Sequence, residues 1–269
     1  MRPVPLLALA FLVIGMACAP AQAADLAGWE LVWSDEFTGP SLDLSKWEFE
    51  VNANGGGNKE LQYYVTNNVR VKDGMLNIEA RHEQYTGPGG TREYTSSRLR
   101  TRRKGDWRYG RLDIRARLPG GRGLWPAIWL LPTDEQYGAW PHSGEIDIME
   151  LLGHEPNKVH GTLHYSDRTG RHRSRGTNTV LAAGSFADDF HVFRLDWDPG
   201  AMRWYVDDRL YQTQTNWTRR SGDFPAPFDQ RFHLILNVAV GGNWPGNPDA
   251  ATSFPQTMTV DYVRIYRRR

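Results

Sequence analysis

The sequence predicts an all-β fold, a sandwich or barrel of short strands, and three observations support this prediction. No long stretch places apolar residues at the spacing of a helix. The apolar residues fall instead into short runs that are rich in β-branched and aromatic side chains. Gly, Pro, Asn and Asp separate these runs, which is typical of strands joined by turns.

Each of these runs is short enough for one strand and is bounded by turn residues. In chain order the clearest are MLNIEARH at 75–82, YGRLDIRARL at 109–118, GLWPAIWLLP at 123–132, GEIDIMELLG at 144–153, HVFRLDWD at 191–198, MRWYVDD at 202–208, FHLILNVAV at 232–240 and TMTVDYVRIY at 257–266. No Ser/Thr/Pro-rich linker, repeat or charge block divides the chain after about Asp25. We therefore expect residues 24–269 to form a single domain.

The first 23 residues resemble an export signal. A single basic residue precedes an apolar run from Pro5 to Ala17, and Ala21-Gln22-Ala23 has the small-x-small pattern of a cleavage site. A membrane anchor is disfavoured because the run is too short for about 30 Å of hydrocarbon. Lipid attachment at Cys18 is the alternative, but residues 15–17 form a poor lipobox. We expect a secreted protein, extracellular or periplasmic, with no membrane contact after cleavage.

Charge and cysteine content exclude several classes of function. The chain has 32 Lys and Arg against 31 Asp and Glu, and loss of Arg2 with residues 1–23 brings the net charge from +1 to 0. This balance indicates neither nucleic acid nor an anionic surface as a partner. Cys18 is the only cysteine, so the cleaved chain has no disulfide, thiol nucleophile or cysteine-bound metal. We expect a monomer.

The segment GEIDIMELLG carries three carboxylates in an otherwise apolar run. In a regular strand Glu145 and Asp147 share one face, whereas Glu150 points to the other. A β-bulge between Asp147 and Glu150 inserts one residue and returns Glu150 to the face of the other two acids. The alternative is a solvated edge strand with ordinary surface acids.

Three carboxylates in one groove repel each other, so the pKa of at least one must rise. A carboxyl group with a raised pKa is suited to act as a general acid near neutral pH. Retaining glycosidases use such a pair, one carboxyl as nucleophile and one as acid/base, about 5–5.5 Å apart. The spacing therefore indicates glycoside hydrolysis, with the two glutamates leaning towards each other.

Tryptophan positions favour a sugar ligand. Trp125 and Trp129 fall on one strand face, where a core position is the alternative reading. Trp244 lies in GGNWPG, a loop in which a large aromatic has little core to fill. Exposed indoles near carboxylates suit sugar rings, whose C–H faces pack on them while the hydroxyls stay hydrogen-bonded.

Two other patterns do not indicate sites. The glycine cluster GGGNKE at 55–60 lacks the strand-to-helix context of a phosphate-binding loop, so we interpret it as a flexible loop at the rim of the groove. His160 and His164 stand four strand residues apart, about 13 Å, which is too far for two ligands of one metal ion. A histidine that supports the carboxylates is the better interpretation.

Taken together, the motifs resemble glycoside hydrolase family 16, and within it the bacterial endo-β-1,3-glucanases, or laminarinases. The resemblance covers nearly all of the chain after the signal and rests on LVWSDEF, NKELQYY, VKDGMLNIEAR, YTSSRLRT, GLWPAIWLLP, WPHSGEIDIMELLG, LILNVAVGGNWPG and FPQTMTVDYVRIY. It implies a β-jelly roll sandwich of two curved antiparallel sheets, with the substrate groove on the concave side. The implied substrate is a β-glucan polysaccharide.

The resemblance also implies roles for individual residues. Glu145 is the expected nucleophile, Glu150 the general acid/base and Asp147 the electrostatic partner between them, with no cofactor for catalysis. The other expected substrate-binding residues are the sugar platforms Trp125, Trp129 and Trp244, the polar contacts Asn58 and Arg98, and His164 near the acid/base. A structural calcium ion is expected on the convex side, held by the Glu36 side chain, the Gly74 carbonyl and the Asp261 side chain, because hard oxygen ligands suit calcium.

Two alternatives remain open at this point. A non-catalytic β-glucan-binding relative would share the sandwich and the aromatics, although such proteins typically lack the glutamates, and all three acids are present. Relatives that hydrolyse mixed-linkage glucan, agar or carrageenan are the second alternative. The bulged motif is one residue longer than that of the narrow mixed-linkage type. The neutral charge argues against sulfated chains, which favour a basic groove.

Overall fold

The computed structural model describes residues 26–269, so the predicted signal and Cys18 lie outside the described residues. The strands are β1 Trp29–Asp35, β2 Glu48–Phe49, β3 Gln62–Tyr64, β4 Val69–Lys72, β5 Met75–Gly87, β6 Gly90–Ser96, β7 Arg98–Arg100, β8 Asp106–Trp107, β9 Gly110–Arg117, β10 Leu124–Pro132, β11 Glu145–Leu151, β12 Lys158–Ser166, β13 His172–Val180, β14 His191–Asp198, β15 Ala201–Val206, β16 Arg209–Gln214, β17 Phe232–Val240 and β18 Gln256–Arg268. Within the described residues the only helix is a 3₁₀ turn, η1, at Gly55–Gly57.

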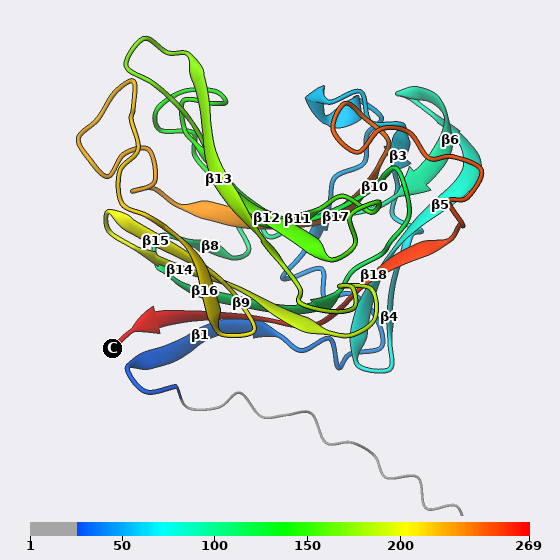
Figure 1. Cartoon of the computed structure of the whole chain (residues 1–269), viewed down its shortest axis with the longest axis horizontal. Helices are drawn as coiled ribbons and strands as arrows, with labels where there is room; N and C mark the ends of the chain where they lie inside the picture. Colours follow the sequence, from blue (N-terminus) through cyan, green and yellow to red (C-terminus); the bar gives the residue numbers. More distant parts are fainter. Residues whose placement is uncertain (1–25) are drawn as a thin grey trace, which may run out of the picture.

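The strands form two stacked sheets (Figure 1). The ten-stranded sheet has the order β16-β15-β14-β9-β18-β5-β6-β3, with β1 beside β18 and β4 beside β5. The eight-stranded sheet has the order β13-β12-β11-β10-β17-β7-β2, with β8 beside β17. Neighbouring strands are antiparallel except β3 and β6. The expected all-β jelly roll of two curved, mainly antiparallel sheets is confirmed.

Strand positions agree with the sequence pattern where the strands are central. β14 and β17 have the predicted bounds, and β9, β15 and β18 start or end within two residues of them. β13 was not predicted, because its nine residues, HRSRGTNTV, are almost all exposed and carry no apolar alternation. It lies at the edge of the eight-stranded sheet, where one long side of the strand is not paired with another described strand.

The core fills the space between the two sheets. All nine residues of β17 are buried, since this strand lies in the middle of its sheet. The facing sheet contributes Trp197 and Trp204, both at most 1% exposed. The eight-stranded sheet therefore buries one face against the core, and Figure 1 shows that the sheet curves so that its other face is concave, with β13 at one end and the β3–β6 region at the other.

Candidate active site

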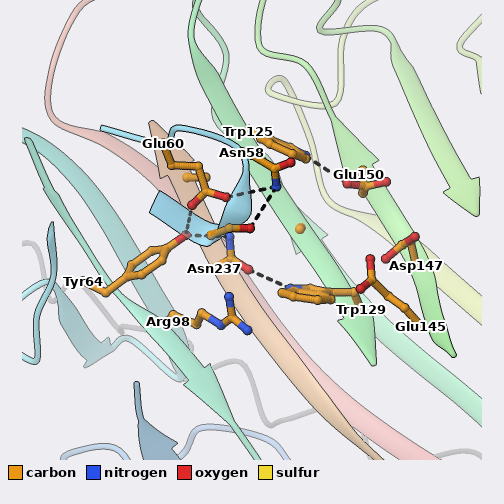
Figure 2. A pocket seen from close by; sticks show the side chains of 13 residues that line it. Asn58, Glu60, Tyr64, Arg98, Trp125, Trp129, Glu145, Asp147, Glu150 and Asn237 are labelled. Atoms are coloured by element: carbon orange, nitrogen blue, oxygen red, sulfur yellow. Dashed lines mark hydrogen bonds between the residues drawn. The ribbon is translucent and has the colours of Figure 1, made fainter. Parts of the chain in front are cut away.

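The predicted β-bulge is present in β11. Asp147 pairs with Thr162 and Glu150 pairs with His160, so two residues of β11 stand against one residue of β12 at this point. The extra residue resets the alternation of side chains, as expected for a bulge. Glu145, Asp147 and Glu150 consequently line one groove (Figure 2). The prediction that Glu150 shares the face of the other two acids is confirmed.

The apolar residues of the bulge explain why the strand adopts it. Ile148 and Met149 lie between the second and third acids and are 2% and 0% exposed. Both belong to the core between the sheets. A regular strand would place one of them in the groove and Glu150 in the core, and both placements cost free energy.

The groove collects residues from five strands and one turn (Figure 2). Its lining is Gly56, Asn58, Glu60, Tyr64, Arg98, Trp125, Ala127, Trp129, Glu145, Asp147, Glu150, Asn237 and Ala239. Six residues outside the acid motif are expected from the sequence to bind substrate. Asn58, Arg98, Trp125 and Trp129 lie in this lining, whereas His164 and Trp244 do not.

Burial and mutual repulsion act on the protonation of all three acids. Burial, followed by the charge of Asp147, raises the pKa of Glu145 to about 8. Burial also raises the pKa of Asp147. The pKa of Glu150 lies well above its ordinary value because of burial and the charges of both neighbours. The cluster thus retains a proton near neutral pH. Glu150 is the acid whose pKa is raised by the negative charges of both neighbouring carboxylates.

Indole N–H groups fix the orientation of the two glutamates. The Trp125 indole donates to Glu150 Oε1 over 3.1 Å, and the Trp140 indole donates to Glu145 Oε2 over 2.8 Å. Trp140 was not among the predicted site residues. The only sequence signal for it is its place in WPHSGEIDIMELLG, five residues before Glu145.

The structure places His164 beside Asp147, and its charge also acts on the pKa of Glu150. His164 lies opposite Glu145, and its Nε2 is 3.2 Å from Asp147 Oδ2 and 4.0 Å from Glu145 Oε1. The histidine opposite Glu150 is His160. Because β11 and β12 are antiparallel, the later histidine of β12, His164, pairs with the earlier acid of β11, Glu145. His164 also stacks on His172, with 2.9 Å between their ring nitrogens.

Aromatic side chains form the wall around Glu150. Trp244 is 42% exposed and meets Trp125 edge to face, with ring centroids 5.4 Å apart at 86°. His160 packs against the same Trp244 ring at 5.0 Å. Trp244 thus lies beside the groove as an exposed aromatic surface, which is the position a sugar platform requires.

Trp129 is held from two sides. Its indole donates to Asn237 Oδ1 over 2.7 Å, and the Arg98 guanidinium lies 4.6 Å from its ring centroid. Arg98 also forms an ion pair with Glu50. These contacts fix the ring and place a cation near the floor of the groove.

The wall opposite the acids is a polar network that the sequence reasoning missed. Glu60 accepts from Gln62 over 2.6 Å. It also accepts from the Tyr64 hydroxyl over 3.3 Å, and Asn237 donates to that hydroxyl over 3.1 Å (Figure 2). The only sequence signals for these residues were the motifs NKELQYY and LILNVAVGGNWPG. The rim position expected for the glycine cluster is confirmed, since Gly56 lines the groove.

The three predicted calcium ligands lie around one stretch of β18, where the pairing with β1 ends at Val263 and the pairing with β5 ends at Val260. Glu36 follows β1, Gly74 lies in the turn before β5, and Asp261 is at the bulge of β18. Their oxygens suit calcium, but both carboxylates already have arginine partners. Arg264 holds Glu36 through two bonds of 2.9 and 2.8 Å, and Arg115 holds Asp261 at 2.6 Å. Calcium binding here requires these arginines to move aside.

One group of acid and histidine side chains in the described part of the chain has metal-like spacing. Potential ligand atoms of Glu145, Asp147 and His164 lie within 4.8 Å of one another. This group coincides with the acid cluster of the groove, so the spacing is accounted for by the paired carboxylates and their histidine.

Comparison with known proteins agrees with this geometry. Residues 57–264 match Glycosyl hydrolases family 16. A beta-glucanase of Rhodothermus marinus is 50% identical over 95% of this chain and 91% of its own length. Glucan endo-1,3-beta-glucosidase A1 of Niallia circulans is 42% identical over 95% of this chain and 40% of its own.

Solved structures of relatives have the same fold. The laminarinase from Rhodothermus marinus superposes with a TM-score of 0.80 at 48% identity, and the match covers 90% of this chain and 98% of that one. The family match spans well over half of the sequence, and the fold agrees with that of a solved laminarinase. The chain is a member of glycoside hydrolase family 16.

Proposed function

We propose that this glycoside hydrolase cleaves internal β-1,3 linkages of laminarin-like β-glucans with retention of configuration. The observation that carries the proposal is the bulge of β11, which brings Glu145 and Glu150 into one groove between aromatic walls. The relatives named beta-glucanase, glucan endo-1,3-beta-glucosidase and laminarinase support the choice of substrate.

In the first step Glu145 attacks the anomeric carbon, and Glu150 protonates the leaving oxygen. The C–O bond to the leaving sugar breaks as the bond to Glu145 forms, which gives a covalent glycosyl-enzyme. The raised pKa of Glu150 keeps its proton available for this step. The Trp140 N–H on Oε2 of Glu145 leaves the other carboxylate oxygen for attack.

In the second step Glu150, now ionised, takes a proton from water. The resulting hydroxide attacks the anomeric carbon from the opposite side and releases Glu145, so the product has the original β-configuration. Asp147 and His164 support both steps. Asp147 raises the pKa values of both glutamates, while His164 beside it lowers them.

We further propose that residues 24–269 act as one catalytic domain, secreted as a soluble monomer after loss of residues 1–23. Processing at Cys18 as a lipoprotein is the alternative. None of the helical segments in residues 26–269 is long and apolar enough to cross a bilayer. A calcium ion at Glu36, Gly74 and Asp261 would stabilise the fold without entering the chemistry. Mass spectrometry of the mature N-terminus distinguishes the two processing routes.

Reducing-sugar release from laminarin, curdlan, lichenan and agarose, measured side by side, tests the substrate. We expect laminarin to be cleaved fastest, with a rapid fall in chain length that marks endo-cleavage. Binding of laminarin without hydrolysis would favour a glucan-binding protein, and preference for lichenan or agarose would favour the other enzymes of the family. NMR of the first product tests the mechanism, because an α-anomer formed first excludes retention.

A further inference from the structure

The bulge of β11 is held from the opposite sheet by one hydrogen bond. The Trp204 indole N–H donates to the carbonyl oxygen of Asp147 over 2.8 Å. Trp204 belongs to β15 of the ten-stranded sheet and is 0% exposed, so this bond crosses the core between the sheets. A bulge disrupts the local ladder of backbone hydrogen bonds, and a buried carbonyl without a partner costs free energy. The indole therefore satisfies the carbonyl at the bulge itself.

Gly161 provides the space for this contact. It is the single residue of β12 between the pairs Thr162–Asp147 and His160–Glu150. A Cβ atom at Gly161 would lie 2.6 Å from Cδ1 and 2.9 Å from Nε1 of Trp204, and both distances are shorter than real Cβ contacts. The indole thus occupies the volume that a side chain at Gly161 would take.

Tyr211 of β16 closes the same space. Its hydroxyl would lie 2.5 Å from a Cβ at Gly161 and is buried without a hydrogen-bond partner within the described residues. The charge of Glu150 adds to burial in raising the pKa of Tyr211, which places this ring within electrostatic reach of the third acid. Two rings of the ten-stranded sheet therefore fill the gap opposite the bulge.

We propose that Trp204 is a positioning residue that fixes the bulge and so holds Glu150 in the groove. The three acids repel one another, which favours any rearrangement that separates them. A shift by one residue would turn Glu150 towards the core, because side chains alternate along a strand. The bond from Trp204 to Asp147 opposes that shift. This inference rests on the proposed roles of Glu145 and Glu150.

Trp204→Phe tests the proposal, with Trp197→Phe as the matched control. Trp197 lies on neighbouring β14, is 1% exposed and donates its indole N–H to the Phe228 carbonyl over 3.2 Å. Each variant removes one buried indole-to-carbonyl bond and keeps an aromatic ring. We expect both to lower the melting temperature by a similar amount, since each loses one hydrogen bond.

The two variants should differ in catalysis. We expect Trp204→Phe to lower kcat on laminarin about 10- to 100-fold with KM within about twofold, since a displaced acid misaligns the reacting groups. Its pH profile should also shift, because the distances among the acids change. Trp197→Phe should keep the wild-type kcat and pH profile. A Trp204→Phe variant with wild-type kcat and pH profile, destabilised only as much as the control, would overturn the proposal.

A measurement on the unaltered protein covers the case in which Trp204→Phe does not fold. In NMR spectra of the wild type, the assigned Trp204 indole N–H signal should move as the acids titrate, because its acceptor is the carbonyl of Asp147. The Trp197 signal should stay constant over the same pH range. Equal insensitivity of the two signals contradicts the proposal.

Failure of the proposed function is recognised separately. If the wild type does not hydrolyse laminarin, or if Glu150→Ala retains full activity, the assigned roles of the acids are wrong whatever Trp204→Phe shows. If the wild type is active and Glu150→Ala is not, a fully active Trp204→Phe counts only against the positioning role of Trp204.

Discussion

The buried acids of the two sheets differ in their partners. On the outer face of the ten-stranded sheet, Asp113 is 5% exposed and accepts three hydrogen bonds from Arg111, over 2.8, 3.0 and 2.6 Å. On the concave face of the eight-stranded sheet, Glu145, Asp147 and Glu150 lie together, with indole N–H groups and a histidine as their main partners. The outer face neutralises its carboxylate, whereas the groove keeps three acids in mutual repulsion.

This difference separates stability from activity. Burial raises the pKa of Asp113 as well, but the bidentate Arg111 opposes that rise, so this carboxylate supports the fold only while the pair is intact. Carboxyl groups without such a partner hold protons near neutral pH, which destabilises the fold but supplies an acid for catalysis. Replacement of a groove acid should therefore lower activity and raise stability. Disruption of the Arg111–Asp113 pair should lower stability and leave activity unchanged.

The largest expected effect is on catalysis by the two glutamates. Glu145→Gly should lower laminarin hydrolysis on the order of 10⁴-fold or more and still use an α-glycosyl fluoride as donor, because Glu150 remains to activate the acceptor. Glu150→Gly should recover turnover with azide and give a β-glycosyl azide. Asp113→Asn, on the outer face, should keep kcat. An α-azide product from the Glu145 variant would reverse the two assignments.

The second effect is on stability. Folding raises the pKa of Glu145 from 4.5 to about 8, so the folded state binds more protons and loses stability as pH rises through that window. Glu145→Gln should therefore raise the free energy of unfolding at pH 8 by on the order of 1–3 kcal/mol, with little effect at pH 4. Denaturant unfolding at both pH values measures this.

The matched change on the outer face is Arg111→Met, which leaves Asp113 buried without its main partner. It should lower the free energy of unfolding by about 3 kcal/mol at neutral pH and leave kcat unchanged. A stabilising effect of Arg111→Met, or a destabilising effect of Glu145→Gln at pH 8, would contradict the contrast between the two faces.

The third effect is on pH dependence. The charge of Asp147 raises the pKa values of both Glu145 and Glu150, so its removal lowers both. Asp147→Asn should therefore move the alkaline limb of the kcat/KM profile, where Glu150 loses its proton, to lower pH. We expect kcat to fall about 10- to 100-fold with retention of configuration. An alkaline limb that stays in place or moves to higher pH would exclude this role for Asp147.

The smallest expected effect is that of calcium on the outer face. If calcium displaces Arg264 and Arg115 from Glu36 and Asp261, saturating calcium should stabilise the fold by about 1 kcal/mol, or about 2–4 °C in melting temperature. Asp261→Asn should remove the response, and kcat at 25 °C should not depend on calcium. Identical melting curves in calcium and in chelator would show that the two ion pairs persist.

The local chemistry of the chain was readable from the sequence. The alternation of short apolar runs predicted the β-sandwich, and β17 has the bounds of the run FHLILNVAV because a strand in the middle of its sheet is buried and therefore mostly apolar. The odd spacing of Glu150 predicted the bulge, since two adjacent apolar residues cannot both reach the core from a regular strand. Glycine and asparagine around Trp244 likewise indicated an exposed aromatic.

Contacts between strands distant in sequence were decided only by the tertiary structure. The sequence could not place His164 beside Asp147, because register depends on how β11 and β12 pair around the bulge. It gave no reason to join Glu60, Tyr64 and Asn237, which come from a loop and from two different strands. Trp204 reads as an ordinary core residue in MRWYVDD. Its hydrogen bond to the acid strand exists because two sheets pack face to face, and periodicity within one strand carries no information about the sheet opposite.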